Sequence, residues 1–297
     1  MPSSFRDTFL HLRPRSWPIV FAHFSGGAVL ALAHAETITI TMVLLYLAGG
    51  ALWTIFLNGG TLAVNSAFDE DEDGADIGYL DNPPPAPPSL ARTAINLMVL
   101  GLAGAFALPW GYFWIYATCF LLSLFYSVPP LRWKRLPGPD IAINMAGYGA
   151  FNFAAGALAP GTGLLYPGLF GAIIWLAFGF AFLFGAFYPM TQIYQMVEDA
   201  AKGDRTLAVR FGARRVLAFS IALVAASGFC QAMAAWTIDM RWWGYLALLC
   251  SSGAWMVFTI DWLRRSEGYP SQKGMYRALK LWGISDVVVI FTFAFAA

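Results

Sequence analysis

Acidic side chains gather directly after an apolar segment that ends near residue 65. The eight positions from Asp69 to Asp76 contain six carboxylates, and no Lys or Arg follows them before Arg92. Asn65, Asp69 and Asp73 are four residues apart, a spacing that places them on one face if the preceding helix continues. Mg²⁺ prefers oxygen ligands and often shares a few carboxylates with phosphate oxygens. The pattern therefore predicts a magnesium site for a phosphate-bearing ligand, with a solvated acidic loop as the alternative.

A second polar segment follows a later apolar stretch. Gln192, Gln195 and Asp199 are three and four residues apart, which again predicts one helix face. Glu198 and Asp204 flank them. The spacing therefore predicts a second acidic site in this segment.

Basic residues stand beside both acidic segments. Arg132 and Lys134 lie in FYSVPPLRWKR, and Lys202 and Arg205 lie next to the second segment. Each is a candidate contact for a diphosphate, because Lys and Arg pair with phosphate oxygens. For any one of them, the alternative is that it only marks the cytosolic side of a membrane.

The composition excludes an ordinary soluble domain. The chain has 297 residues, of which 59% are hydrophobic and only 12% charged, whereas soluble domains carry about 25% charged residues. The net charge of +1 excludes a globally basic nucleic-acid binder, so no nucleic-acid partner is expected. Cys119, Cys230 and Cys250 have no spacing typical of a zinc site or a disulfide framework. The chain is predicted to be an integral membrane protein.

Long apolar stretches predict how the chain crosses the membrane. They are Leu-, Ala- and Phe-rich without the alternation of barrel strands, which indicates helices. We predict an all-α polytopic membrane protein, a single transmembrane domain over residues 1–297 with nine helices. The predicted spans lie near 17–35, 40–64, 93–109, 111–129, 141–159, 164–190, 214–236, 242–262 and 279–297.

The basic residues also predict the topology. Of the 18 Lys and Arg residues, only Arg241 falls in a loop between an odd and the following even span. The positive-inside rule then places the N-terminus and all even-to-odd loops in the cytosol and the C-terminus outside. Both acidic segments lie in even-to-odd loops, so they can face each other across one cavity and bind one bridged diphosphate.

These motifs resemble those of the UbiA superfamily of intramembrane prenyltransferases. NSAFDEDED fits the family's NxxxDxxxD pattern, and LRPRSWP, YSVPPLRWK and GDRTLAVRFG resemble three further family segments in the correct order. The resemblance implies a bundle of nine transmembrane helices, with Mg²⁺ as cofactor and an isoprenyl diphosphate as substrate. It also implies that Asn65, Asp69, Asp73 and Asp199 bind metal and diphosphate, and that Lys134 or Arg132 contacts the diphosphate. Gln195 stands where the second family motif usually has an Asp, a change for which Glu198 is expected to compensate.

The reaction implied is ionisation of an allylic diphosphate and transfer of the prenyl group to an apolar acceptor, aromatic or isoprenoid. Tyr126, Tyr188 and Tyr194 are the aromatic residues closest to the motifs, and Gln192 and Gln195 are further substrate-binding candidates.

A terpene cyclase on the same scaffold is the main alternative. A cation transporter using the intramembrane Asp286 is a less favoured one. Membrane lipid is the surrounding partner, and a bacterial or archaeal inner membrane is the expected location.

Polar residues inside the predicted spans have two interpretations. Asp286 is either a functional acid or a partner in a buried interhelical hydrogen bond. His23, Asn144 and Asn152 are expected to be hydrogen-bonded core groups rather than substrate ligands.

Overall fold

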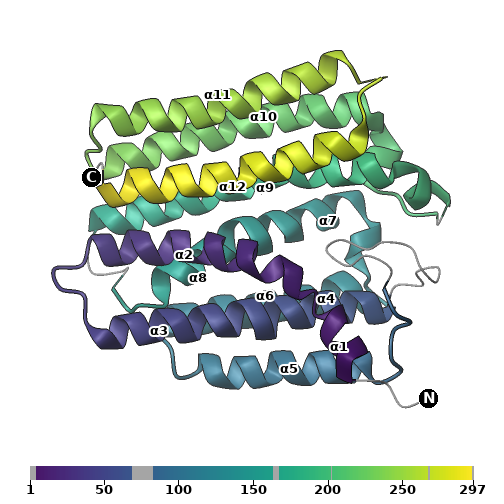
Figure 1. Ribbon diagram of the computed structural model, residues 1–297, viewed down its shortest axis with the longest axis horizontal. Helices are drawn as coiled ribbons and strands as arrows, with labels where there is room; N and C mark the ends of the chain where they lie inside the picture. Colours follow the sequence, from purple (N-terminus) through teal and green to yellow (C-terminus); the bar gives the residue numbers. More distant parts are fainter. Residues whose placement is uncertain (1–4, 69–82, 163–166, 202, 267, 296–297) are drawn as a thin grey trace.

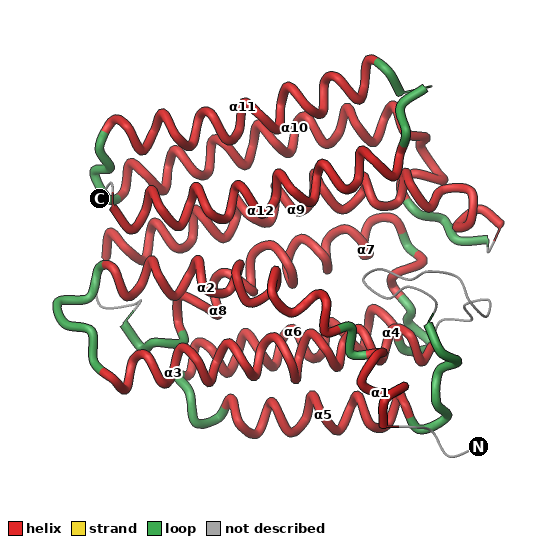
Figure 2. Tube along the Cα trace, in the orientation of Figure 1, coloured by secondary structure: helices red, strands yellow, loops and turns green. Residues whose placement is uncertain are grey.

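The structure is a computed structural model that describes residues 5–68, 83–162, 167–201, 203–266 and 268–295, without the side chains of Pro167 and Glu198. All regular secondary structure in these residues is helical, and loops join the helices, with no strand among the described residues (Figure 2). This confirms the predicted all-α class.

The N-terminal half of the bundle contains five helices and one short turn. They are α1 (Phe5–His11) and α2 (Trp17–Ala33), joined by the 3₁₀ turn η1 (Pro14–Ser16); α3 (Ile40–Ala51), η2 (Leu52–Asn58) and α4 (Gly59–Phe68), which form one continuous helix; α5 (Leu90–Ala105); and α6 (Trp110–Ser127). Thr39 caps α3, because its hydroxyl accepts the backbone N–H of Met42 at 3.3 Å.

The rest of the chain adds five long helices and one short turn. The turn is η3 (Trp133–Arg135). The helices are α7 (Pro137–Asn144), η4 (Met145–Phe151) and α8 (Asn152–Leu158), again continuous; α9 (Pro167–Ala201); α10 (Leu207–Thr237); α11 (Trp242–Arg264); and α12 (Ser271–Phe295). Pro137 begins α7 at a position where its missing N–H leaves no helical bond unmade.

Seven helical segments in the described residues are long and apolar enough to cross a membrane. They are Phe5–Ala33, Ile40–Phe68, Pro137–Leu158, Gly168–Val197, Leu207–Thr237, Trp242–Arg264 and Ser271–Phe295. The two other predicted spans correspond to α5, which is only 16 residues long, and α6, which is rich in Trp and Tyr. The polytopic prediction is confirmed, and the count of nine spans stays a prediction.

The long helices lie side by side along the bundle (Figure 1). The ends of α4, α6, α9 and α11 and the starts of the helices that follow them all lie at the right-hand end of this view. The even-to-odd connections therefore share one end of the bundle, as the topology prediction requires. Which compartment this end faces stays a prediction.

Two hydrophobic cores meet at α2 and α8. One core contains residues of α2, η2, α4, α5, α6 and α8. The other contains residues of α9, α10, α11 and α12, together with residues of α2 and α8. Glycines let α2 and α8 approach closely: a Cβ on Gly27 would overlap the backbone oxygen of Phe153, and a Cβ on Gly156 would overlap that of Phe24. Gly156 therefore serves the close packing of two helices, as small residues do in membrane bundles.

Two helical segments are π-helical and so wider than an α-helix. They are η2 in the second predicted span and η4 in the fifth. Such segments frequently occur at functional sites, because the wider turn changes which side chains point inward. Trp53, Leu57 and Asn58 of η2 and Gly147 and Tyr148 of η4 line the same cavity.

Candidate active site

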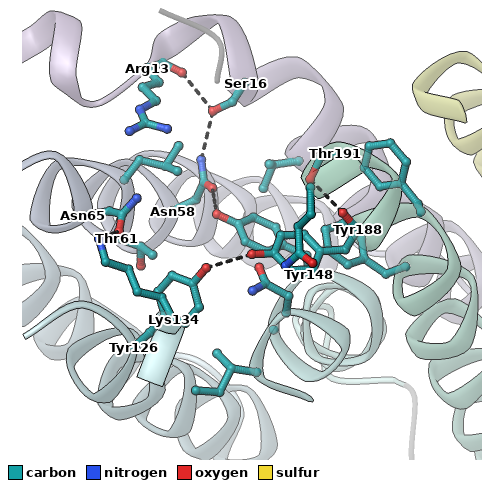
Figure 3. Close-up of a pocket in the computed structure, with 18 of the residues that line it drawn as sticks. Arg13, Ser16, Asn58, Thr61, Asn65, Tyr126, Lys134, Tyr148, Tyr188 and Thr191 are labelled. Atoms are coloured by element: carbon teal, nitrogen blue, oxygen red, sulfur yellow. Dashed lines mark hydrogen bonds between the residues drawn. The ribbon is translucent and has the colours of Figure 1, made fainter. Parts of the chain in front are cut away.

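One cavity of about 870 Å³ lies between the two halves of the bundle and extends to the end that carries the even-to-odd connections. Residues of α2, η2, α4, α6, η3, α7, η4, α9 and α12 line it. Ten of its residues are labelled in Figure 3.

The first acidic segment begins at the wall of this cavity. Asn65 lies on α4, and its Oδ1 accepts hydrogen bonds from Lys134 Nζ at 3.2 Å and from Ser127 Oγ at 3.3 Å (Figure 3). The structure thus brings Asn65 and Lys134, two of the predicted site residues, together on one wall. Asp69 and Asp73 follow the end of α4 and lie outside the described residues.

The second acidic segment lies on the opposite wall. Because α9 continues to Ala201, Gln192, Gln195 and Asp199 share one helix, and all three line the cavity, which confirms their predicted common face. Asp199 Oδ2 accepts a hydrogen bond from Thr206 Oγ1 at 3.2 Å. Lys202 and the side chain of Glu198 lie outside the described part of the chain.

Basic side chains stand at the mouth of the cavity. Arg132 and Lys134 line it as predicted, while Arg205 is exposed and is not among the described lining residues. Arg135, the third basic residue of FYSVPPLRWKR, also lines the cavity, and so do Arg13 and Arg15, which the sequence analysis did not select. The paired Arg residues of LRPRSW were the available signal.

Arg13 is held in place by the turn that begins the first long helix. It adopts a left-handed backbone conformation with φ of 50° and is only 6% exposed. Its Nη2 donates to Ser66 Oγ at 3.0 Å, and Ser66 is the residue after Asn65. A buried guanidinium is costly without a partner, so the hydrogen bond to Ser66 helps to hold this cation close to Asn65.

The two central tyrosines meet a carboxylate that the sequence analysis did not select. Asp140 is 1% exposed, and its Oδ1 accepts hydrogen bonds from Tyr188 Oη at 2.8 Å and Tyr126 Oη at 3.0 Å. Its Oδ2 accepts a bond from Gln192 Nε2 at 2.6 Å. Three predicted site residues from two distant helices are thus gathered by one side chain. Nothing in PGPD marks this Asp, because its partners are distant in the sequence.

Tyr194 lies nearer the surface than the other two tyrosines. It lines the cavity but is 41% exposed, and its hydroxyl accepts a hydrogen bond from Gln272 Nε2 at 3.5 Å. Its position at the mouth, between α9 and α12, differs from that of the buried pair.

The cavity changes from polar to aromatic with depth. On α9 it begins at Asp199 and ends at Phe184, fifteen residues earlier, which is about 22 Å along a helix. On the other walls the polar end of α2 is followed by Ile19 and Val20, and the α12 wall ends at Trp282. Charged and apolar parts of one ligand can therefore bind at opposite ends of this cavity.

The intramembrane acid has a hydrogen-bonded partner. His23 Nδ1 lies 2.6 Å from Asp286 Oδ1, and His23 Nε2 lies 3.0 Å from the backbone oxygen of Gly149. Asn152 Nδ2 donates to the backbone oxygen of Val20 at 3.2 Å, and Asn144 Nδ2 donates to that of Asp140 at 3.0 Å. The expected core hydrogen bonds of His23, Asn144 and Asn152 are confirmed, and all three also line the cavity.

The donors at the mouth suit a metal-bound diphosphate. Asn65 and Asp199 offer oxygen atoms from facing walls, and Arg13, Arg132 and Lys134 offer cationic groups to phosphate oxygens. Within the described residues, no three His, Cys, Asp or Glu side chains lie close enough together to hold a metal ion, and the carboxylates of 69–76 are outside them. The described residues at the mouth therefore suit Mg²⁺ and a diphosphate, the ligands that the sequence predicts.

Comparisons with known proteins agree with this geometry. The chain matches the model of the UbiA prenyltransferase family over residues 19–284. It is 28% identical over 232 residues to a lycopene elongase/hydratase of Halobacterium salinarum, covering 72% of this chain and 74% of that protein.

Solved structures share the fold at low identity. A digeranylgeranylglyceryl phosphate synthase has a TM-score of 0.74 with 15% identity, over 97% of this chain and 98% of the other. A UbiA homologue from Archaeoglobus fulgidus bound to GPP and Mg²⁺ has a TM-score of 0.67 with 21% identity, over the same shares. Since the family model covers most of the sequence, the chain belongs to the UbiA prenyltransferase family and is a membrane-embedded prenyltransferase.

Proposed function

We propose that this enzyme transfers a prenyl group from an isoprenyl diphosphate to an apolar isoprenoid acceptor in the membrane, with Mg²⁺ as cofactor. The observation that carries the proposal is the gradient along the 870 Å³ cavity, which has cations and oxygen ligands at its mouth and aromatic rings at depth. This distribution matches an amphiphilic substrate with a diphosphate head and an apolar tail. Two solved homologues from Archaeoglobus fulgidus are bound to GPP or DMAPP together with Mg²⁺.

The roles at the mouth follow from charge. Arg13, Arg132 and Lys134 would bind the diphosphate and stabilise the negative charge that grows as it leaves. Asn65 and Asp199 would hold Mg²⁺ together with Asp69, Asp73 and Glu198. When bound, Mg²⁺ supplies Lewis-acid stabilisation of the leaving group.

The roles at depth follow from the aromatic walls. Departure of diphosphate leaves an allylic cation, whose charge ring faces can stabilise. Phe184, Phe187 and Trp282 line the deep part, where exclusion of water prevents simple hydrolysis.

The acceptor is the least constrained part of the proposal. The relative from Halobacterium salinarum is named a lycopene elongase/hydratase. Lycopene is therefore the first acceptor to test, before aromatic compounds.

The test measures diphosphate release and product together. Purified protein receives Mg²⁺ and dimethylallyl or geranyl diphosphate, with or without lycopene. We expect Mg²⁺-dependent diphosphate release and a lycopene derivative heavier by the prenyl group. Asp69→Ala and Asp73→Ala should abolish both, with Asp239→Ala as a control outside the cavity.

Two results would contradict the proposal. A cyclic product formed from the prenyl diphosphate alone would establish the cyclase alternative. Unchanged turnover in the presence of excess chelator would remove Mg²⁺ from the reaction.

A further inference from the structure

Asp140 is a buried carboxylate at the cavity wall, and its presence there needs an explanation. Its hydrogen-bond donors in the described structure are all uncharged: Tyr126, Tyr188, Gln192 and Asn144. Burying a charge beside neutral groups is costly compared with an apolar residue of the same size. The wall therefore contains a carboxyl group whose burial costs stability.

One oxygen of this carboxylate and two phenol oxygens form a closed triangle. Tyr188 Oη lies 2.8 Å from Asp140 Oδ1, Tyr126 Oη lies 3.0 Å from the same oxygen, and the two phenol oxygens lie 3.0 Å apart. Each phenol has one hydrogen and the carboxylate has none. Two hydrogens therefore serve three short O···O contacts, and the triangle has room for one more proton.

The triangle is well placed to receive that proton from a ligand. Tyr126, Tyr188, Asn144 and Gln192 all line the cavity, whereas Asp140 lies behind them. Figure 3 shows the hydroxyls of Tyr126 and Tyr188 directed toward each other in the wall. Tyr188 is one helical turn from Phe184 and eleven residues from Asp199. It therefore stands between the polar mouth and the aromatic interior.

We propose that the triangle of Tyr126, Asp140 and Tyr188 accepts the proton that is released when the reaction ends. The inference rests on the proposed function, in which the allylic cation attacks a C=C bond of the acceptor. That attack forms a C–C bond and leaves a tertiary cation on the acceptor.

The final step balances without a further reagent. A C–H bond next to the cationic carbon breaks, its electron pair forms a new C=C bond, and the proton passes to Tyr188 Oη. The proton already on Tyr188 moves along the 2.8 Å hydrogen bond to Asp140 Oδ1. If water adds to the cation instead, the proton lost by that water follows the same route.

The three residues have different parts in this step. Tyr188 contacts the substrate and is the catalytic residue. Asp140 acts through Tyr188 and is a positioning residue, and Gln192 holds its second oxygen at 2.6 Å. Tyr126 completes the triangle, so its hydroxyl should contribute less than that of Tyr188.

The test uses the ratio of coupled product to diphosphate released, with dimethylallyl diphosphate, Mg²⁺ and lycopene as probes. This ratio does not depend on how much of the protein is folded, because both quantities come from active molecules. Without a proton acceptor the coupled cation reverts, and water captures the prenyl cation as the alcohol. General bases typically contribute about 10²- to 10⁴-fold to a step.

We expect Tyr188→Phe and Asp140→Asn to lower the ratio by at least about tenfold while diphosphate release continues, with more prenyl alcohol. Tyr126→Phe should lower the ratio less. Tyr112→Phe is the matched control, because Tyr112 is buried on the same helix as Tyr126, donates to the Gly49 backbone oxygen at 2.7 Å and does not line the cavity.

An unchanged ratio in both Tyr188→Phe and Asp140→Asn would overturn the inference and leave the proposed function intact. An equal fall in the Tyr112→Phe control would also overturn it, since the effect would then come from packing. If the wild-type enzyme formed no coupled product from these probes, the proposed acceptor chemistry would fail first, and the inference with it.

Discussion

At the scale of single residues, the cavity joins two sites that the sequence separates by more than a hundred positions. Asn65 and Lys134 share a hydrogen bond on one wall, and Asp199 stands on the other. Asn65 and Asp199 were predictable because each belongs to a motif with helical spacing, and Lys134 was predictable because it stands in a basic segment. Asp140 was not predictable, because a lone Asp acquires its meaning only from neighbours brought in by the fold, and Arg13 was marked only by the paired Arg residues of LRPRSW.

Gln195 supports a prediction at this scale. It lines the cavity one helical turn before Asp199, and its neutral amide attracts Mg²⁺ less strongly than a carboxylate does. Gln195→Asp should lower the Mg²⁺ concentration needed for half-maximal diphosphate release. Asp199→Asn should raise it several-fold or eliminate turnover.

The measurement is a Mg²⁺ titration of diphosphate release for both variants and the wild type. The control is Gln272→Asp, because Gln272 is exposed and the change adds a carboxylate at the same mouth. Gln231→Asp would not serve, because that side chain is buried in the core. Identical titration curves for Asp199→Asn and the wild type would show that the second segment has no metal role.

At the scale of helices, the sequence predicted where each long segment lies but not its internal geometry. The predicted spans 40–64 and 141–159 correspond to continuous helices that contain η2 and η4. Hydrophobic patterns do not reveal a π segment, since its wider turn depends on packing against other helices. The extension of α9 to Ala201 was predictable in part, because Gln192, Gln195 and Asp199 continue the helical spacing past the apolar stretch.

Close packing of α2 against α8 gives a prediction about stability. In Gly156→Ala the new Cβ would meet the backbone oxygen of Phe24, which cannot rotate away as a side chain can. We expect a loss of about 1–3 kcal/mol, the usual cost of overpacking, seen as a lower Tm in detergent.

The matched control is Gly253→Ala on α11. No atom lies within 4 Å of a Cβ built at Gly253, and Ala favours a helix over Gly by up to about 1 kcal/mol. Its Tm should equal or exceed that of the wild type. Equal losses in the two variants would show that helix approach is not the reason for Gly156.

At the scale of the whole molecule, one buried pair connects the beginning and the end of the chain. His23 on α2 contacts Asp286 on α12 at 2.6 Å, across 263 positions in the sequence. The sequence indicated Asp286 as a polar group in a span but could not identify its partner, because that partner comes from the opposite end of the chain.

The pair predicts a non-additive effect on stability. Removing one partner of a buried hydrogen bond typically costs about 1–3 kcal/mol, and more for charged groups, because the other partner is left unsatisfied. Asp286→Leu should therefore lower Tm strongly, and so should His23→Leu. The double variant should lose less than the sum of the two. Strictly additive losses in thermal unfolding would mean that the two side chains do not interact.

The orientation in the membrane is a further prediction for the whole molecule. Because only Arg241 among the Lys and Arg residues falls in an odd-to-even connection, reporters at the N-terminus and within 202–206 should be cytosolic. A reporter at the C-terminus should be external. A cytosolic C-terminus would require an even number of spans, which bears directly on α5 and α6.

The π segments also have a consequence for register. Residues on an α-helix are about 100° apart around its axis, and η4 lies between α7, which contributes Asp140, and α8, which packs on α2 through Gly156. Deleting one residue from η4 to restore α-helical winding would rotate one of these faces relative to the other by about that angle. The carboxylate behind the tyrosines and the glycine contact could then not both be kept. The length of this segment therefore couples the chemistry of the cavity wall to the assembly of the two halves.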